Sequence, residues 1–133
     1  KGMDFGILKK TASGGEMSRI MLAIKAILAK YSHLPTIIFD EIDTGVSGDV
    51  ANKMGEIMKE MSKNMQVMAI THLPQVASKG HQHFKVSKDH NSEQTVSEIK
   101  LLSTEDRIKE IAQMLSGENI TDSAISHAKE LLN

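Results

Sequence analysis

The most informative apolar stretch of the chain is short and continuous. Residues 37–39 (IIF) follow Pro35 and Thr36 and end directly on Asp40 and Glu41. A run of this kind, rich in β-branched residues, predicts a strand buried on both faces. Two adjacent carboxylates at its end are costly unless they face a cleft, a cation or water. Ligand crevices of open α/β sheets lie at the carboxyl ends of the strands, so the pattern predicts a strand that delivers two acids to a site.

Helical periodicity precedes this strand. Ser13 is placed to cap the helix, and Glu16, three residues later, completes a capping-box pattern. Gly14 and Gly15 leave backbone N–H groups uncovered at the positive end of the helix dipole, which makes either an anion site or a plain capped turn. The predicted buried face repeats at helical spacing and comprises Met17, Ile20, Met21, Ile24, Ile27, Leu28 and Tyr31.

A second strand is predicted beyond the acids. It covers residues 66–70 (QVMAI) and follows a loop at 43–48 (DTGVSG) and a helix at roughly 48–63. Strand, helix and strand of these lengths predict a right-handed crossover and a parallel pair. The second strand ends on Thr71 and His72. Because parallel neighbours end at the same edge of a sheet, His72 is expected to lie near the two acids.

The rest of the chain predicts a hairpin and two helices. A short helical turn is expected after Pro74, followed by antiparallel strands at 82–88 and 95–102 around a turn at 89–94. Phe5, Ile7 and Leu8 predict either an edge strand or an ordered lead-in within residues 1–12. The expected helix caps are Ser47, Ser103 and either Thr121 or Asp122, with Gly117 ending the first C-terminal helix. The expected buried face of the helix at 48–63 is Val50, Met54, Ile57, Met58 and Met61.

Together these elements predict one α/β domain over residues 1–133, with parallel core strands, an antiparallel hairpin and C-terminal helices. The composition fits an ordinary globular protein, with 40% hydrophobic and 25% charged residues. A net charge of −1 gives no global basic field for nucleic acid. The absence of cysteine excludes disulfides and thiolate metal sites, and no apolar run is long enough to span a membrane. Lys1 is not a natural start, so an excised or processed piece is expected.

The acids and the histidine suggest phosphate chemistry. Asp40 can hold Mg²⁺, which prefers hard oxygen ligands, and Glu41 can orient or deprotonate an attacking water. His72 can contact a phosphate oxygen or that water. These are parts for phosphoryl transfer, where catalysis is mainly positioning and charge stabilisation. His81 and His83 are two apart and on a strand could bind a metal, but a polar strand face beside a hairpin is the favoured explanation, since the sequence fixes no third ligand.

At this point the residues resemble a family. Ser13–Glu16 (SGGE) looks like the signature motif of ATP-binding-cassette ATPases, and residues 37–41 look like their Walker B strand. Asp43 occupies the place of the D-loop aspartate and His72 that of the switch histidine. A closer resemblance is to the RecN family of bacterial DNA repair proteins, which are SMC-like ATPases. It covers nearly the whole chain, through KKTASGGEMSRIMLAIK, IIFDEIDTGVSGDVA, THLPQVAS and QMLSGENITDSAISHAKELL.

The resemblance implies a role for each motif. Asp40 would hold the Mg²⁺ of ATP, Glu41 would polarise the attacking water, and His72 would sense the γ-phosphate. The signature motif, with Glu16 completing it, would contribute Ser13, Gly14 and Gly15 to the γ-phosphate of ATP held by a partner head. Asp43 would help to couple the two composite sites. The implied fold is the C-terminal lobe of a P-loop NTPase head of the ABC/SMC type.

One motif of this family is missing. No G-x-x-x-x-G-K-[ST] sequence occurs, so the loop that cradles the phosphates is absent. In RecN-like chains it lies in an N-terminal half beyond a long coiled coil. The resemblance therefore implies three partners, namely that Walker A half, a second head in a homodimer, and DNA, and no membrane. The chain alone is expected neither to bind ATP tightly nor to hydrolyse it.

The setting that the resemblance implies is double-strand-break repair and recombination in the bacterial cytoplasm, at the nucleoid.

Two alternative functions remain when only the residues are considered. One is a metal-dependent phosphohydrolase that uses Asp40, Glu41 and His72, and it predicts activity on small phosphoesters by this chain alone. The other is a non-enzymatic phosphoacceptor or partner-binding α/β module, which predicts no nucleotide dependence even when the missing half is supplied.

Overall fold

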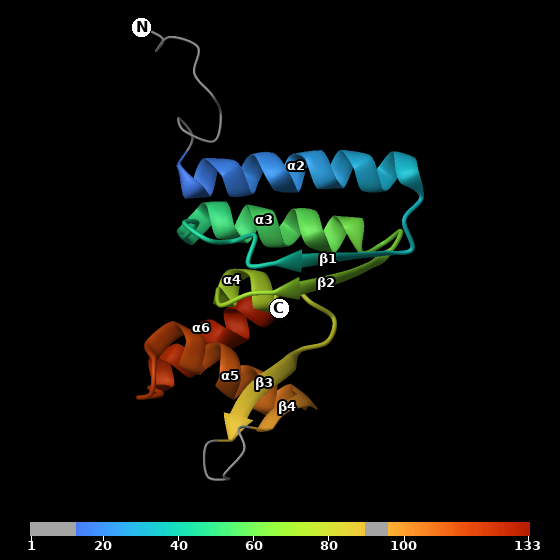
Figure 1. The fold of residues 1–133 in the computed structure, drawn as a ribbon. Coiled ribbons are helices and arrows are strands. Elements are labelled where there is room, and N and C mark those ends of the chain that lie inside the picture. The colour runs from blue at the N-terminus through green and yellow to red at the C-terminus, as the bar shows by residue number, and fades with distance from the viewer. Residues whose placement is uncertain (1–12, 90–95) are drawn as a thin grey trace, which may run out of the picture. The chain divides into compact units, whose positions relative to one another are not determined.

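A computed structural model describes the backbone of residues 13–89 and 96–133 (Figure 1). The lead-in at residues 1–12 and most of the expected turn at 89–94 lie outside the described residues. The chain divides into two compact units, one ending at Val76 and the other beginning at Ala77, and each is described by itself. The expectation of a single domain over residues 1–133 stays a prediction.

The first unit contains two parallel strands and the helices that pack on them. Its elements are α2 (Gly14–Ser32), β1 (Thr36–Asp40), α3 (Gly48–Met61) and β2 (Gln66–Ile70), with the short α4 (Pro74–Ala77) at its end. Strands β1 and β2 are paired in parallel, from Thr36 opposite Gln66 to Asp40 opposite Ile70. Figure 1 shows the two strands side by side and ending at the same edge. The predicted strand–helix–strand unit is therefore confirmed.

One face of this sheet carries the core of the first unit. Phe39 is fully buried there with Leu22 of α2 and Met54 and Met58 of α3. Burying an apolar side chain of this size contributes about 1.5–3 kcal/mol. The opposite face of the sheet is uncovered, with Ile38 55% exposed and Met68 and Ile70 also exposed. The prediction that this strand is buried on both faces is therefore wrong for the residues described.

The buried side of α2 also differs from the prediction. Leu22 and Ala29, two turns apart, are buried, whereas Ile27 is 59% exposed and Leu28 and Tyr31 are exposed as well. The helix has two apolar sides, and the side with the smaller residues packs inward. In α3, Met54 and Met58 are buried as expected, but Ile57 is exposed. Ser47 occupies the N-cap position there without making a side-chain capping hydrogen bond.

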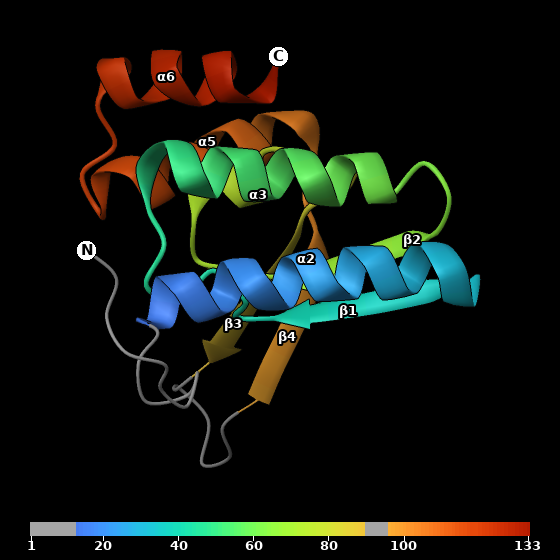
Figure 2. The ribbon, with the colours of Figure 1, turned by 90° about the horizontal axis from the view of Figure 1, so that it is seen from above.

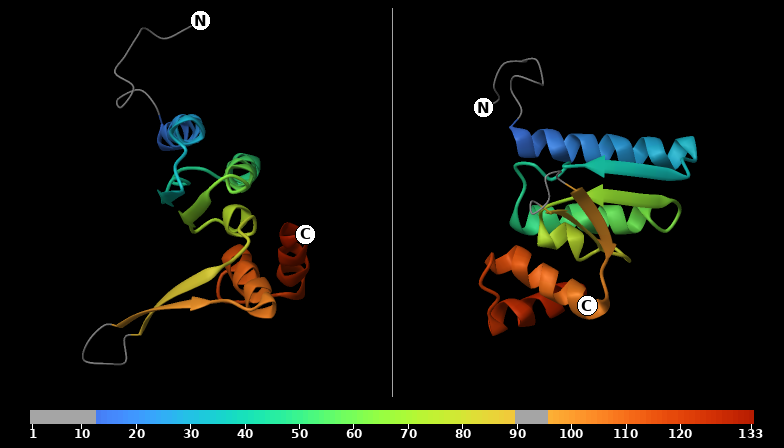
Figure 3. Two further views of the ribbon diagram at one scale, coloured as in Figure 1. Left: turned by 90° about the vertical axis from the view of Figure 1, so that its right-hand side faces the viewer. Right: turned by 60° about the horizontal axis from the view of Figure 1, so that its bottom comes forward.

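The second unit contains the predicted hairpin and two helices. Strands β3 (Phe84–Asp89) and β4 (Val96–Leu101) are antiparallel, and α5 (Thr104–Ser116) packs beside α6 (Asp122–Leu132), as Figures 2 and 3 show. Ile111, Ala112 and Ala128 are fully buried between these helices. Ser103 and Thr121 cap them through their hydroxyl oxygens, so Thr121 rather than Asp122 is the second cap. Gly117 ends α5 with a φ of 76°, as predicted.

Candidate functional site

The two acids lie where the sheet ends. Asp40 is the last residue of β1, and the N–H of Glu41 donates to the Ile70 carbonyl at 3.1 Å, which extends the ladder by one bond. Glu41 has a φ of 46°, a left-handed conformation that costs a non-glycine residue about 1–3 kcal/mol. Thr44 holds this turn, since its N–H and hydroxyl both donate to the Glu41 carbonyl, at 3.2 and 2.9 Å. The backbone therefore leaves the strand sharply at Glu41.

Both acids face outward. The residues of Asp40 and Glu41 are exposed, and neither carboxylate is bonded or ion-paired to another described side chain. Within residues 13–89 and 96–133, no group of three or more histidines and acids is arranged to hold a metal. Mg²⁺ needs only one or two protein carboxylates when phosphate and water complete its shell. Asp40 therefore fits one ligand of a site shared with a nucleotide, and the described residues do not fit an all-protein metal cage.

The next strand brings His72 to this edge. It lies two residues beyond Ile70, the partner of Asp40. Its Nδ1 atom is 3.8 Å from Oδ1 of Asp43, and the Thr71 hydroxyl donates to Oδ2 of the same carboxylate. The Leu73 N–H in turn donates to Thr71 Oγ at 3.0 Å. The loop after β1 and the end of β2 are thus joined through a buried aspartate, and Thr71 is a site residue that the sequence analysis did not assign a role.

The start of α2 has the predicted capping box. The Glu16 N–H donates to Ser13 Oγ at 3.3 Å, and the Ser13 N–H donates to Glu16 Oε2 at 2.8 Å. Hydrogen bonding of the Glu16 carboxylate, first to the backbone N–H and then to the side chain of Ser13, lowers the pKa of Glu16 below its ordinary value. A carboxylate in the first turn also favours the helix dipole. Glu16 therefore shapes and stabilises the helix start.

This helix start is packed against the loop that follows the acids. A Cβ atom added to Gly15 would lie 2.4 Å from the Gly45 carbonyl oxygen, so only glycine fits there. Gly45 itself has a φ of 73°, which also favours glycine. Ser18 Oγ lies 3.0 Å from the carbonyl oxygens of both Gly14 and Thr44. The helix start that was predicted to bind an anion therefore packs directly against the loop that follows the two acids. The only sequence signal for this packing was the presence of glycine at Gly15 and at Gly45.

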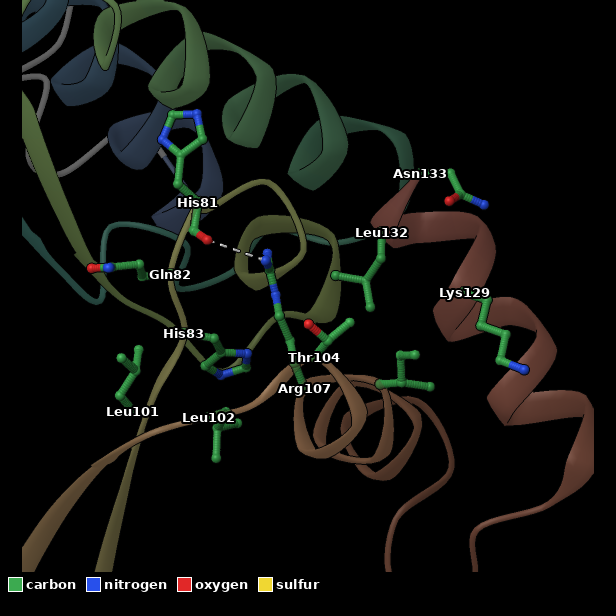
Figure 4. Close-up of a pocket in the computed structure, with 11 residues that line it drawn as sticks. His81, Gln82, His83, Leu101, Leu102, Thr104, Arg107, Lys129, Leu132 and Asn133 are labelled. Carbon is green, nitrogen blue, oxygen red and sulfur yellow. Dashed lines mark hydrogen bonds between the residues drawn. The ribbon is translucent and has the colours of Figure 1, made fainter.

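The second unit contains a pocket that the sequence analysis did not predict. It has a volume of about 360 Å³ and is lined by residues that include His81, His83 and Arg107 (Figure 4). The Arg107 guanidinium donates to the carbonyls of Ala77, Ser78, Gly80 and His81. Burial, and then the charge of Arg107, lowers the pKa of His83.

The predicted pairing of His81 and His83 on a strand is wrong, because β3 begins only at Phe84. Figure 4 shows their rings pointing in different directions. Among the described residues, neither histidine belongs to a cluster of metal-binding side chains. His90 lies outside the described residues.

Comparison with known proteins gives the family. No family model matches the chain. It is 46% identical to the DNA repair protein RecN of Rickettsia felis over 132 residues, which are 99% of this chain and 24% of that protein. It is 46% identical to RecN of Bacillus subtilis over 94% of this chain and 22% of that protein, and 42% identical to RecN of Deinococcus radiodurans over 98% and 23%. The chain therefore spans about a quarter of the length of these relatives.

Solved structures give the fold. One is from a study titled "Structural biochemistry of ATP-driven dimerization and DNA stimulated activation of SMC ATPases", with a TM-score of 0.68, 24% identity, and coverage of 89% of this chain and 70% of that chain. Another is an Smc head bound to the C-winged helix domain of ScpA, with a TM-score of 0.64, 28% identity, and coverage of 75% and 29%. No described helix is long and apolar enough to cross a membrane. The chain has the α/β fold of part of an SMC head domain, and it belongs to the RecN family of DNA repair proteins.

Proposed function

We propose that this chain is the C-terminal lobe of an ATPase head in a bacterial DNA repair protein. The complete protein would hydrolyse ATP to ADP and phosphate and use head association in double-strand-break repair and recombination, as part of the DNA damage response. It would act in the cytoplasm at the nucleoid. The observation that carries this proposal is the packing of the SGGE helix start against the loop that follows Asp40 and Glu41, at the end of a parallel sheet.

In this proposal each exposed group has a separate task. Asp40 would hold Mg²⁺, which would neutralise charge on the phosphates. Glu41, turned away from the strand by its left-handed backbone, would orient and deprotonate the attacking water. His72 would contact the γ-phosphate. The Ser13 hydroxyl and the amides of Gly14 and Gly15, at the positive end of α2, would bind the γ-phosphate of ATP held by a second head. Asp43 would help to couple the two sites.

The proposal requires a partner for this chain. The phosphate-gripping loop would come from the N-terminal Walker A half of the same protein, and the second signature motif from the other head of a homodimer. DNA would bind to the full-length protein. The uncovered sheet face around Ile38 is what a lobe without its other half is expected to expose. The chain alone would therefore be inactive, and only the complete head would bind ATP tightly.

The experiment compares Glu41→Gln with Glu60→Gln in the complete protein. Glu60 is exposed on α3 and its carboxylate pairs with Lys63 three residues away, so it serves as the control. Glu41→Gln is expected to leave ATP binding intact and to slow hydrolysis by at least about 100-fold, the effect of removing a general base. Unchanged turnover by Glu41→Gln would refute the role of Glu41.

The rival functions give different results in the same experiment. Mg²⁺-dependent hydrolysis of ATP or small phosphoesters by the 133-residue chain alone, abolished by Glu41→Gln, would favour a phosphohydrolase. An absence of any nucleotide-dependent association after the Walker A half is supplied would favour a binding module without enzymatic activity. Either result would overturn the proposal.

A further inference from the structure

Asp43 is a buried carboxylate with one oxygen satisfied and one oxygen unsatisfied. The side chain is only 1% exposed, although Glu41, Thr44 and Gly45 of the same loop are exposed. Its Oδ2 atom accepts the Thr71 hydroxyl, which is itself held by the Leu73 N–H. Its Oδ1 atom is buried and has no hydrogen-bond partner among the described residues. A buried carboxylate oxygen left in this state is unfavourable, so a donor is expected to approach it.

The nearest candidate donor is the imidazole of His72. Its Nδ1 atom is 3.8 Å from Oδ1 of Asp43, and its side chain is 67% exposed and therefore free to adjust. A movement of roughly 1 Å would bring the two atoms to ordinary hydrogen-bond distance. Thr71 precedes His72 directly, so its bond to Oδ2 already fixes the backbone that carries the imidazole. The carboxylate is therefore linked to this segment in two ways, by its bond to the hydroxyl of the preceding Thr71 and by the close approach of the His72 ring.

We propose that Asp43 is a positioning residue that acts through His72. The Nδ1–H of His72 donates to Oδ1 of Asp43, which fixes the ring tautomer and leaves Nε2 as the nitrogen available to a phosphate oxygen or an attacking water. Carboxylates that accept from one ring nitrogen fix histidine tautomers in this way in other sites. The inference rests on the proposed role of His72, and it assigns Asp43 a task that needs no contact with ATP or a second head.

A purely structural Asp43 would give different behaviour. The loop is also held by bonds that do not involve this carboxylate, such as the Val46 N–H donating to the Asp43 carbonyl at 3.1 Å. If the side chain served only to hold the loop, its substitution would lower stability without altering the His72 ring. The ring nitrogens therefore report on the inference directly.

The first arm of the test is nuclear magnetic resonance of the 133-residue chain labelled with ¹⁵N-histidine, at a pH where imidazoles are neutral. The inference expects the Nδ1–H tautomer for His72, and Asp43→Asn is expected to shift the ring toward the Nε2–H tautomer because the amide can donate to Nδ1. The control Asp49→Asn, an exposed residue paired with Lys53, is expected to leave the ring signals unchanged. Identical His72 ring signals in the wild type and Asp43→Asn would overturn the inference.

The second arm measures ATP hydrolysis by the complete protein. Asp43→Asn is expected to lower kcat by about 10- to 100-fold with KM for ATP within about twofold. This is less than the roughly 10⁴-fold loss seen when an orienting aspartate is replaced in a serine protease, because His72 is exposed and need not carry the transferred proton. Thr71→Val is expected to lose part of this activity and Thr71→Ser to keep it, because serine retains the hydroxyl that Asp43 accepts.

The two arms separate this inference from the proposed function. Wild-type kcat in Asp43→Asn would overturn the inference, even if the complete protein is an ATPase. A complete protein with no ATP hydrolysis would refute the proposed function. The contact between Asp43 and His72 would then still be decided by the ring tautomer in the chain alone.

Discussion

In the first unit the two carboxylates at the end of β1 are exposed and make no described side-chain bond, whereas in the second unit the guanidinium of Arg107 is bonded to backbone carbonyls. Asp40 and Glu41 make no bond to another described side chain. Arg107 donates to four carbonyl oxygens between Ala77 and His81. Exposed charges at a sheet edge can serve a ligand, whereas a bonded guanidinium orders the chain around it. The comparison favours the sheet edge as the proposed site and a structural role for Arg107 in the second unit.

The largest expected effect tests the structural role of Arg107. Arg107→Met removes charge-assisted donors from four carbonyls, two of them in partly buried hydrogen bonds, and is expected to lower the free energy of unfolding by about 3 kcal/mol. Arg107→Lys is expected to recover only a part, because one ammonium cannot reproduce the planar fork. Urea denaturation, with amide hydrogen exchange to place the loss in α5 and α6, measures both. Lys109→Met, on an exposed residue of the same helix, is the control.

The same variant can break the comparison. If Arg107→Met kept its stability but lost ATP-dependent activity in the complete protein, the pocket would be a functional site and its role would not be purely structural. A loss of both stability and activity would be resolved by Arg107→Lys, which is expected to regain activity in proportion to stability.

The next effect concerns the glycines at the start of α2. Gly15→Ala places a Cβ atom 2.4 Å from the Gly45 carbonyl oxygen, and the overlap is expected to outweigh the gain in helix propensity, with a net loss of about 2 kcal/mol. Gly14→Ala meets nothing closer than the Thr44 carbonyl at 3.9 Å, so its stability is expected to change by less than about 0.5 kcal/mol. Thermal unfolding of the two variants measures the difference. Equal stabilities would show that the helix start and the loop are not packed as described.

A smaller effect comes from two caps with the same geometry in the two units. Ser13 and Ser103 both accept an N–H from the third residue beyond, at 3.3 and 3.1 Å. Replacing either by alanine is expected to cost about 1 kcal/mol of stability. Only Ser13→Ala is expected to weaken ATP-dependent association of heads in the complete protein, measured by sedimentation with and without nucleotide. Equal association by the two variants would mean that the SGGE helix start has no ligand role.

Features encoded by neighbouring residues could be predicted from the sequence. The capping box of Ser13 and Glu16, the parallel strands and the hairpin all follow from local spacing, and the structure confirms them. The buried side of α2 could not be predicted, because the helix has two apolar sides and the choice depends on packing against distant residues, among them Gly45 and Phe39. The prediction that the strand is buried on both faces was wrong for a related reason, because no described residue covers Ile38.

The contacts of the candidate site were also beyond sequence analysis. The sequence placed His72 at the same edge as the acids through topology. It gave no sign that Asp43 is buried against Thr71, 28 residues away, or that Arg107 binds carbonyls 26 to 30 residues before it. Such pairs depend on how distant segments pack, and no local periodicity reports them. The sequence therefore predicts which residues reach the edge of the sheet, but it does not predict which of their side chains are bonded to other parts of the chain.

The smallest effect is the dependence of stability on pH in the second unit. Burial, followed by the charge of Arg107, lowers the pKa of His83 below its ordinary value of 6.5, while Glu110 opposes the shift and Lys85 adds to it. The unfolded chain therefore binds a proton on this residue more readily than the folded chain, so stability is expected to fall as the pH drops below about 6.5. Above that pH both states are neutral at His83 and the contribution vanishes.

Urea denaturation of the wild type and His83→Gln between about pH 5 and pH 8 measures this dependence of stability on pH, because glutamine removes the titration. The control is His127→Gln, on an exposed residue of α6, which is expected to keep the wild-type dependence of stability on pH. If His83→Gln also kept the wild-type dependence, the second unit would not bury the His83 imidazole in its neutral form.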